Sequence, residues 1–159
     1  GYPASIQGFD AYEKLAGDSK KWINEGWVDY FTPQLYWPIA QSAQSYPVLL
    51  DWWLGENTKG RHMWVGHSAS RAAAGTFKRD ELNAQIRITR ETAQRDSARL
   101  RATGDVHFSM KALMPSPDDS LGQRPAPHLL RELYPQDALV PASPWLGRVR
   151  PAAPTARLQ

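Results

Sequence analysis

Residues 27–39 read Trp-Val-Asp-Tyr-Phe-Thr-Pro-Gln-Leu-Tyr-Trp-Pro-Ile. The short apolar run predicts a buried parallel strand over residues 28–36, and the proline that follows ends it. Gln34, Tyr36 and Trp37 then lie at the carboxyl edge of the sheet. Their rings offer flat apolar faces and the amide offers a donor and an acceptor, a combination suited to a sugar-like ligand. The alternative is that these aromatic side chains only fill a core, and composition alone favours neither interpretation.

The rest of the chain predicts helices and strands in alternation. A capping box at Asp10–Glu13 begins a helix over about 11–24. Further helices are expected from Pro47 to before Gly60, from 80 to about 91 and over 129–134, and further strands over 62–66 and 105–110. The order predicts parallel strands covered by helices, as in a doubly wound sheet or part of a (β/α) barrel. Residues 147–159 are expected to be a linker or a disordered tail.

Length and composition bound the class of protein. The 159 residues are enough for one modest core, and 42% hydrophobic with 22% charged residues indicates a globular chain. Without cysteine there is neither a disulfide nor a thiolate metal site. No run reaches the length of a membrane span and no signal peptide is visible. Because the chain begins with Gly1, we interpret the start as a cut, so a missing signal does not argue for the cytoplasm.

The charge is unevenly distributed. Residues 1–60 carry 4 basic and 7 acidic side chains, whereas residues 61–159 carry 15 and 9. A basic cluster could bind phosphate or nucleic acid, but Glu91 and Asp96 interrupt it and no aromatic residue is interleaved. We therefore interpret it as a solvated helix face and expect no nucleic-acid partner. The cluster consists of Arg87, Arg90, Arg95, Arg99 and Arg101.

Polar side chains follow the other two predicted strands. Ligands of parallel α/β folds bind at the carboxyl ends of the strands, so these residues would join Gln34, Tyr36 and Trp37 in one rim. The rim suits hydroxyl-rich or anionic ligands. Its further candidate substrate-binding residues are His67 and Arg71 after the second strand, and Ser109 and Lys111 after the third.

The sequence lacks the motifs that usually indicate serine hydrolysis or metal binding. His67 lies near Ser68 and Ser70, but no Gly-x-Ser-x-Gly elbow is present, which argues against a serine hydrolase. The four histidines do not have metal-ligand spacing, and we expect neither a metal nor a cofactor. His62 and His107 lie inside strands and are expected to be hydrogen-bonded structural residues.

The acidic residues do not form a convincing catalytic pair. Glycoside hydrolysis generally needs two carboxylates that flank the scissile bond. Asp29 and Asp105 are expected at strand starts, the wrong end of the sheet, and only Asp118 and Asp119 follow a strand. The sequence thus predicts a ligand-binding rim without its catalytic carboxylates.

Segments along most of the chain resemble the glycosyl-hydrolase-like 10 family. The resemblance rests on Gly-Phe-Asp-Ala-Tyr-Glu-Lys-Leu (8–15), Lys-Trp-Ile-Asn-Glu-Gly-Trp-Val-Asp-Tyr (21–30), Pro-Gln-Leu-Tyr-Trp-Pro-Ile (33–39), Pro-Val-Leu-Leu-Asp-Trp-Trp (47–53), Ala-Gln-Ile-Arg-Ile-Thr-Arg (84–90), Val-His-Phe-Ser-Met-Lys (106–111) and Ala-Leu-Val-Pro-Ala-Ser-Pro-Trp-Leu (138–146). It implies that residues 1–146 are the carboxyl-terminal portion of a (β/α)8 TIM barrel, about its last three βα units. His67 and the Arg-rich stretch 91–104 depart from what we expect of relatives.

The resemblance also implies a function for the longer protein. It would be a bacterial glycoside hydrolase acting on bacterial or extracellular polysaccharide, with its catalytic acids upstream of this chain. It would be extracellular, periplasmic or a cell-envelope lipoprotein. Gln34 and Tyr36 would bind sugar hydroxyls, Trp37 would stack on a sugar ring, and Arg71 with Lys111 would pair with a sugar carboxylate. The partner would be the missing amino-terminal part of the same barrel, and a fragment of this kind should expose apolar surface.

Two alternatives stay open at this point. One is a non-catalytic carbohydrate-binding or scaffolding protein, which a pair of carboxylates across the barrel mouth would argue against. The other, weaker, is an anion-binding interaction domain built on the arginine cluster.

Overall fold

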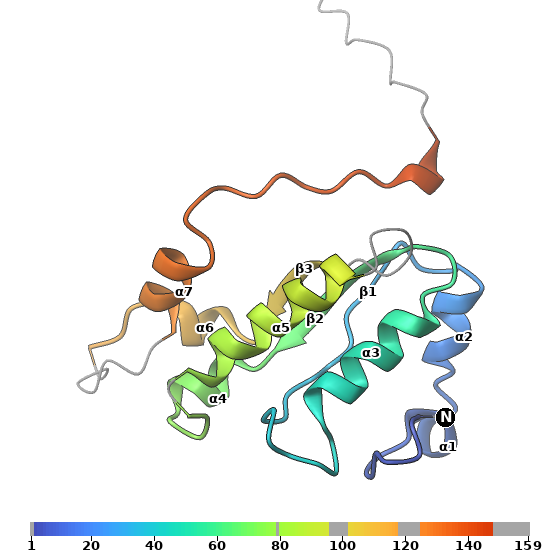
Figure 1. Cartoon of the computed structure of the whole chain (residues 1–159), viewed down its shortest axis with the longest axis horizontal. Coiled ribbons are helices and arrows are strands. Elements are labelled where there is room, and N and C mark those ends of the chain that lie inside the picture. The colour runs from blue at the N-terminus through green and yellow to red at the C-terminus, as the bar shows by residue number, and fades with distance from the viewer. Residues whose placement is uncertain (1, 79, 96–101, 118–124, 148–159) are drawn as a thin grey trace, which may run out of the picture.

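The structure is a computed structural model that describes residues 2–78, 80–95, 102–117 and 125–147. Figure 1 shows its arrangement, with α3 and α5 side by side along one face of a small sheet. The strands are β1 (Tyr30–Phe31), β2 (His62–His67) and β3 (Ala102–His107). The helices are α1 (Ala11–Leu15), α2 (Ser19–Asn24), α3 (Tyr46–Glu56), α4 (Ala69–Ala73), α5 (Glu81–Arg95), α6 (Met110–Leu113) and α7 (Ala126–Glu132), and a 3-10 turn covers Pro144–Leu146.

The three strands form one parallel sheet in the order β1-β2-β3. Val65 of β2 lies opposite Asp105 of β3, and His67 lies opposite His107. A single bridge between Gln34 and Gly66 continues the pairing beyond β1. The predicted alternation of helices with parallel strands is confirmed, whereas closure into a (β/α)8 barrel stays a prediction.

The first helix was predicted as one element and is two. Asp10 begins α1, where its carboxylate accepts a hydrogen bond from the Tyr12 N–H (2.9 Å). Ala16 then adopts a left-handed conformation with φ 52°. Asp18 begins α2 as a second N-cap, accepting from the Lys21 N–H (3.0 Å). A second capping residue inside the predicted helix therefore explains the difference.

Two strand boundaries also differ from the prediction. β1 spans two residues instead of 28–36, because Pro33 lacks the N–H needed for a continuous ladder. β3 covers 102–107 instead of 105–110, and Ser109 already begins α6. The helices expected after Pro47 and from residue 80 are confirmed as α3 and α5, and the last one lies slightly earlier, as α7.

Two clusters of buried apolar residues hold these elements together. In the first, α3 packs on the alternate residues of β2 that face it, and in the second, α5 packs on α4, α6 and α7. The first contains Ile6, Ile23, Leu35, Tyr46, Leu49, Leu50, Leu54, Met63 and Val65; the second contains Ala69, Leu82, Ile86, Ala112, Leu129 and Leu133.

Apolar side chains are exposed on the other face of the sheet. Tyr30 stacks on Trp64 at 4.3 Å between ring centroids and is 52% exposed. Val106 and Phe108 are exposed as well. The expectation of exposed apolar surface is therefore confirmed.

Some predictions fall outside the described residues, namely those on Arg99, Arg101, Asp118, Asp119 and the tail from 148 to 159. Among the helices that the structure describes, none is both long and apolar enough to cross a membrane.

Candidate functional site

The carboxyl ends of the three strands meet at one rim, as predicted. Tyr36 follows β1, Arg71 lies in α4 directly after β2, and Phe108 follows β3. The Tyr36 and Phe108 ring centroids are 5.9 Å apart. The Arg71 Nη1 donates a hydrogen bond to the Tyr36 carbonyl oxygen (2.8 Å). We call these three residues the rim site.

Short-range contacts fix the backbone beneath the rim site. The Ser68 Oγ accepts a hydrogen bond from the Arg71 N–H and so caps α4. The Ser70 N–H (2.9 Å) and hydroxyl (3.1 Å) both donate to the Phe108 carbonyl oxygen. The Phe108 N–H in turn donates to the His67 carbonyl oxygen (2.9 Å). Small polar residues after β2 therefore hold the backbone of Phe108 next to α4.

The other predicted site residues lie in different surroundings. Gln34 is exposed, and Lys111 is exposed on α6, which Ser109 begins. Trp37 packs against the first core cluster, and its carbonyl oxygen accepts a hydrogen bond from the Gln85 amide (3.1 Å). Its ring is therefore on the helix-covered side of the sheet.

His67 is fully buried and does not lie on the rim surface. It is 0% exposed, and its Nε2 donates to the Asp105 Oδ1 at 2.7 Å. The same pair corrects the expectation for Asp105, which lies within β3 opposite Val65 and not at the strand start. We therefore assign His67 to a buried polar cluster beneath the rim site. Figure 1 shows the strands that carry the two residues, covered by α5.

This polar cluster consists of His67, Asp105, Tyr134 and His107. The Tyr134 hydroxyl donates to the Asp105 Oδ2 (2.8 Å), so both carboxylate oxygens have partners. The His107 Nε2 lies 3.2 Å from the Tyr134 hydroxyl oxygen. Arg90 of α5 places its guanidinium 4.9 Å from the centre of the Tyr134 ring. The cluster thus joins β2, β3, α5 and the residues that follow α7.

The environment of the cluster shifts the pKa of three members. Burial alone would raise the pKa of Asp105, but the hydrogen bond and electrostatic attraction of His67, with the Tyr134 hydrogen bond, bring it below its ordinary value. Burial lowers the pKa of His107 to about 4, and His67 acts in the same direction. Burial, followed by the charge of Asp105, raises the pKa of Tyr134. The cluster is therefore most stable with Asp105 ionised and His107 neutral.

Folding stability is expected to fall as the pH is lowered from about 6.5 towards 4. In that window the unfolded chain protonates His107, whose ordinary pKa is 6.5, while the folded chain does not. Protonation of His107 thus favours the unfolded state. The stability that depends on a neutral His107 is fully present above pH 6.5 and is lost as the pH falls. Below pH 4, protonation of Asp105 removes a further contribution. Urea unfolding at pH 7.5 and pH 5 measures the difference, and His107→Gln should reduce it. An equal difference in the variant would contradict the assignment.

His62 and Asp29 have partners away from the rim site. His62 lies near the Thr103 hydroxyl (3.2 Å) and the Ser143 hydroxyl (3.0 Å), which confirms its predicted hydrogen bonding. Asp29 accepts from the Trp145 indole N–H (2.7 Å) at the amino end of the sheet. Within the described ranges, no group of three metal-ligating side chains is arranged to hold an ion.

The sequence predicts one strand over 105–110, which places Phe108 inside the strand and not at the rim, whereas β3 ends at His107. The signal was present in the alternation along β3. Asp105 and His107 point to the helices, so Val106 and Phe108 must point to the opposite, exposed face. Applying that period to the end of the strand would have placed Phe108 beside Tyr36.

The structure thus brings two aromatic rings and a guanidinium together at the carboxyl end of a parallel α/β sheet. The model of the family described as glycosyl hydrolase-like 10 matches residues 2–81. The chain is 35% identical over 145 residues to glycosyl hydrolase YngK of Bacillus subtilis (strain 168), covering 90% of this chain and 27% of that protein. It is 43% identical over 50 residues to glycosyl hydrolase DigH of Escherichia coli (strain K12), covering 31% of this chain and 11% of that protein.

The chain belongs to the glycosyl hydrolase-like 10 family, which confirms the resemblance found in the sequence. It spans 27% of the length of YngK and 11% of DigH.

Proposed function

We propose that this chain forms part of the carbohydrate-binding surface of a glycoside hydrolase that acts on bacterial or extracellular polysaccharide. The observation that carries the proposal is the convergence of two aromatic rings and a guanidinium at the carboxyl ends of parallel strands. Family membership supports a carbohydrate ligand.

Each residue of the rim site has a role that follows from its chemistry. Phe108 is 57% exposed and offers a ring face on which a pyranose can stack. Tyr36 adds a second ring and a hydroxyl that binds sugar hydroxyls. The Arg71 Nη1 donates to the Tyr36 carbonyl oxygen, and the guanidinium lies 5.9 Å from the centre of the Phe77 ring. Its other N–H donors would bind a sugar carboxylate. Ser109 and Lys111 follow Phe108 at the start of α6 and would extend this surface.

The catalytic acids belong, in this proposal, to the remainder of a longer protein. Within the described residues, the carboxylates with known contacts cap helices, pair with lysine or arginine, accept from backbone, amide or indole N–H groups, or join the buried cluster. Their partners do not include the rim site. The remaining strands of a (β/α)8 barrel would pair with the free edges of β1 and β3, in a protein located outside the cytoplasm or in the cell envelope.

The isolated chain is expected to bind an acidic oligosaccharide without hydrolysing it. Isothermal titration with tetragalacturonic acid, a soluble carboxylate-bearing glycan, measures affinity, and release of reducing sugar measures turnover. Phe108→Ala should weaken binding about tenfold, the loss of roughly 1.4 kcal/mol of stacking and buried area. Trp27→Ala is the matched control, because Trp27 is 65% exposed and lies in the loop that leads into β1, outside the rim site. Unchanged affinity in the Phe108 variant, or turnover by the isolated chain, would refute the proposal.

A further inference from the structure

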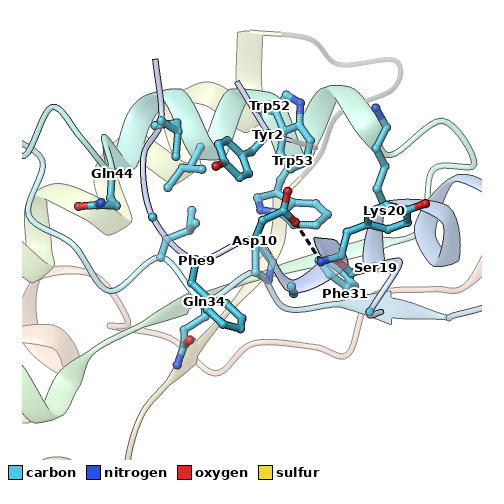
Figure 2. A pocket seen from close by; sticks show the side chains of 18 of the residues that line it. Tyr2, Phe9, Asp10, Ser19, Lys20, Phe31, Gln34, Gln44, Trp52 and Trp53 are labelled. Atoms are coloured by element: carbon cyan, nitrogen blue, oxygen red, sulfur yellow. Dashed lines mark hydrogen bonds between the residues drawn. The ribbon is translucent and has the colours of Figure 1, made fainter. Parts of the chain in front are cut away.

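A pocket of about 470 Å³ lies between the amino-terminal segment, β1 and α3. Figure 2 shows aromatic side chains that enter it from both the amino-terminal segment and α3. We call it the aromatic pocket. None of the three rim-site residues lines it. Its aromatic lining includes Tyr2, Phe9, Tyr12, Phe31, Trp52 and Trp53.

One side of the aromatic pocket is held in place by ring contacts. Phe31 and Trp53 have their ring centroids 4.6 Å apart, and the centroids of Trp52 and Trp53 are 4.7 Å apart in an edge-to-face arrangement. These rings are fixed by α3 and β1, which belong to the core. In the amino-terminal segment, Phe9 is 69% exposed and Tyr2 is 40% exposed. The pocket thus combines a rigid aromatic wall with rings whose faces are left open to a ligand.

The polar side chains of the pocket disfavour an anionic ligand. Lys20 is the basic residue of the lining, and its Nζ already pairs with the Glu56 carboxylate at 2.8 Å. Asp10 and Asp18 place two carboxylates along the same lining. Phosphate or carboxylate groups would therefore meet net repulsion. Neutral hydrogen-bonding groups are supplied by the side chains of Ser19, Thr32, Gln34 and Gln44.

We propose that the aromatic pocket binds a short neutral oligosaccharide, at a site separate from the rim. Pyranose rings have apolar faces for the aromatic walls and hydroxyls for the amides and carboxylates. The volume is within the range of small-ligand pockets. The choice of a sugar among neutral ligands rests on the proposed function, whereas the location and the preference for a neutral ligand do not. Two sites on one chain would hold a polysaccharide at two points and raise its overall affinity.

Titration of the 159-residue chain with chitotetraose, a neutral tetrasaccharide, tests the inference. Tryptophan fluorescence and isothermal titration both report on binding. Phe9→Ala should weaken binding of chitotetraose about tenfold, because its exposed ring adds a stacking face. Phe9 is too exposed to contribute much to folding. Trp27→Ala is the control for loss of an exposed ring elsewhere, and Phe108→Ala tests the rim site. Trp27→Ala should bind chitotetraose as the wild-type chain does, whereas Phe108→Ala measures how much the rim site contributes to that affinity.

The outcomes separate this inference from the proposed function. Chitotetraose affinity that is lost with Phe9→Ala and kept with Trp27→Ala supports the aromatic pocket, whatever happens with tetragalacturonic acid. Affinity lost only with Phe108→Ala overturns it and leaves the rim site supported. Binding of a neutral apolar dye such as Nile red, without binding of chitotetraose at millimolar concentration, also overturns the inference. The pocket would then be an apolar groove for another segment of protein.

Discussion

Asp105→Ala is expected to lower the free energy of unfolding by about 3 kcal/mol. The carboxylate is only 9% exposed, and it accepts hydrogen bonds from both the His67 Nε2 and the Tyr134 hydroxyl. Its removal leaves two buried donors without an acceptor, which costs more than the loss of the two bonds alone. Chemical denaturation at pH 7.5, followed by circular dichroism, measures the change.

Asp137→Ala is the matched control for this substitution. Asp137 is exposed in the segment after α7, so its loss should change the free energy of unfolding by less than about 0.5 kcal/mol. Asp105→Asn keeps the shape of the side chain and should lie between the two, since the amide retains one acceptor oxygen. Equal stability of the Asp105→Ala and Asp137→Ala variants would show that the polar cluster does not stabilise the fold.

The fold was predictable where local signals agree. The apolar run of β2, the proline at the start of α3 and the acidic start of α5 each indicated the right element. The points at which these elements are interrupted were harder to predict, because an aspartate such as Asp18 can lie within a helix as well as cap one. Pro33 similarly allows an extended chain while removing a ladder hydrogen bond, so β1 is shorter than its apolar run.

The sequence predicted which residues lie at the carboxyl edge of the sheet. It did not predict which face of the sheet each side chain occupies. Successive residues of a strand point to opposite sides of the sheet. Leu35 is buried in the core, so Trp37 shares its side and Tyr36 takes the other. The same period places His67 with Met63 and Val65, beneath the helices. Packing between distant segments decides which face of the sheet the helices cover. The sequence of a single strand does not reveal that face.

Pairings between distant residues were the least predictable part of the structure. His67 and Asp105 are 38 positions apart, and Tyr134 is 29 beyond Asp105. Each residue alone has several reasonable roles, such as a ligand contact for His67 or a strand start for Asp105. Only the parallel register of β2 and β3, together with the position of α7, brings the three side chains together. The buried cluster is thus a property of the tertiary fold and not of a local motif.

Leu50→Ala is expected to lower the free energy of unfolding by about 3 kcal/mol. Leu50 is 0% exposed in the first core cluster, where α3 packs on β2. The substitution removes buried methyl groups and leaves a cavity that the rigid surroundings cannot fill. Val48→Ala on the same helix is the control: Val48 is 37% exposed, so its loss should cost less than about 1 kcal/mol. Urea titration of both variants measures the two values.

Because α3 also carries Trp52 and Trp53, the same experiment tests whether the wall of the aromatic pocket belongs to the cooperative core. If Leu50→Ala and Val48→Ala were equally mild, α3 would not be packed on the sheet as described, and the pocket would lose its rigid side.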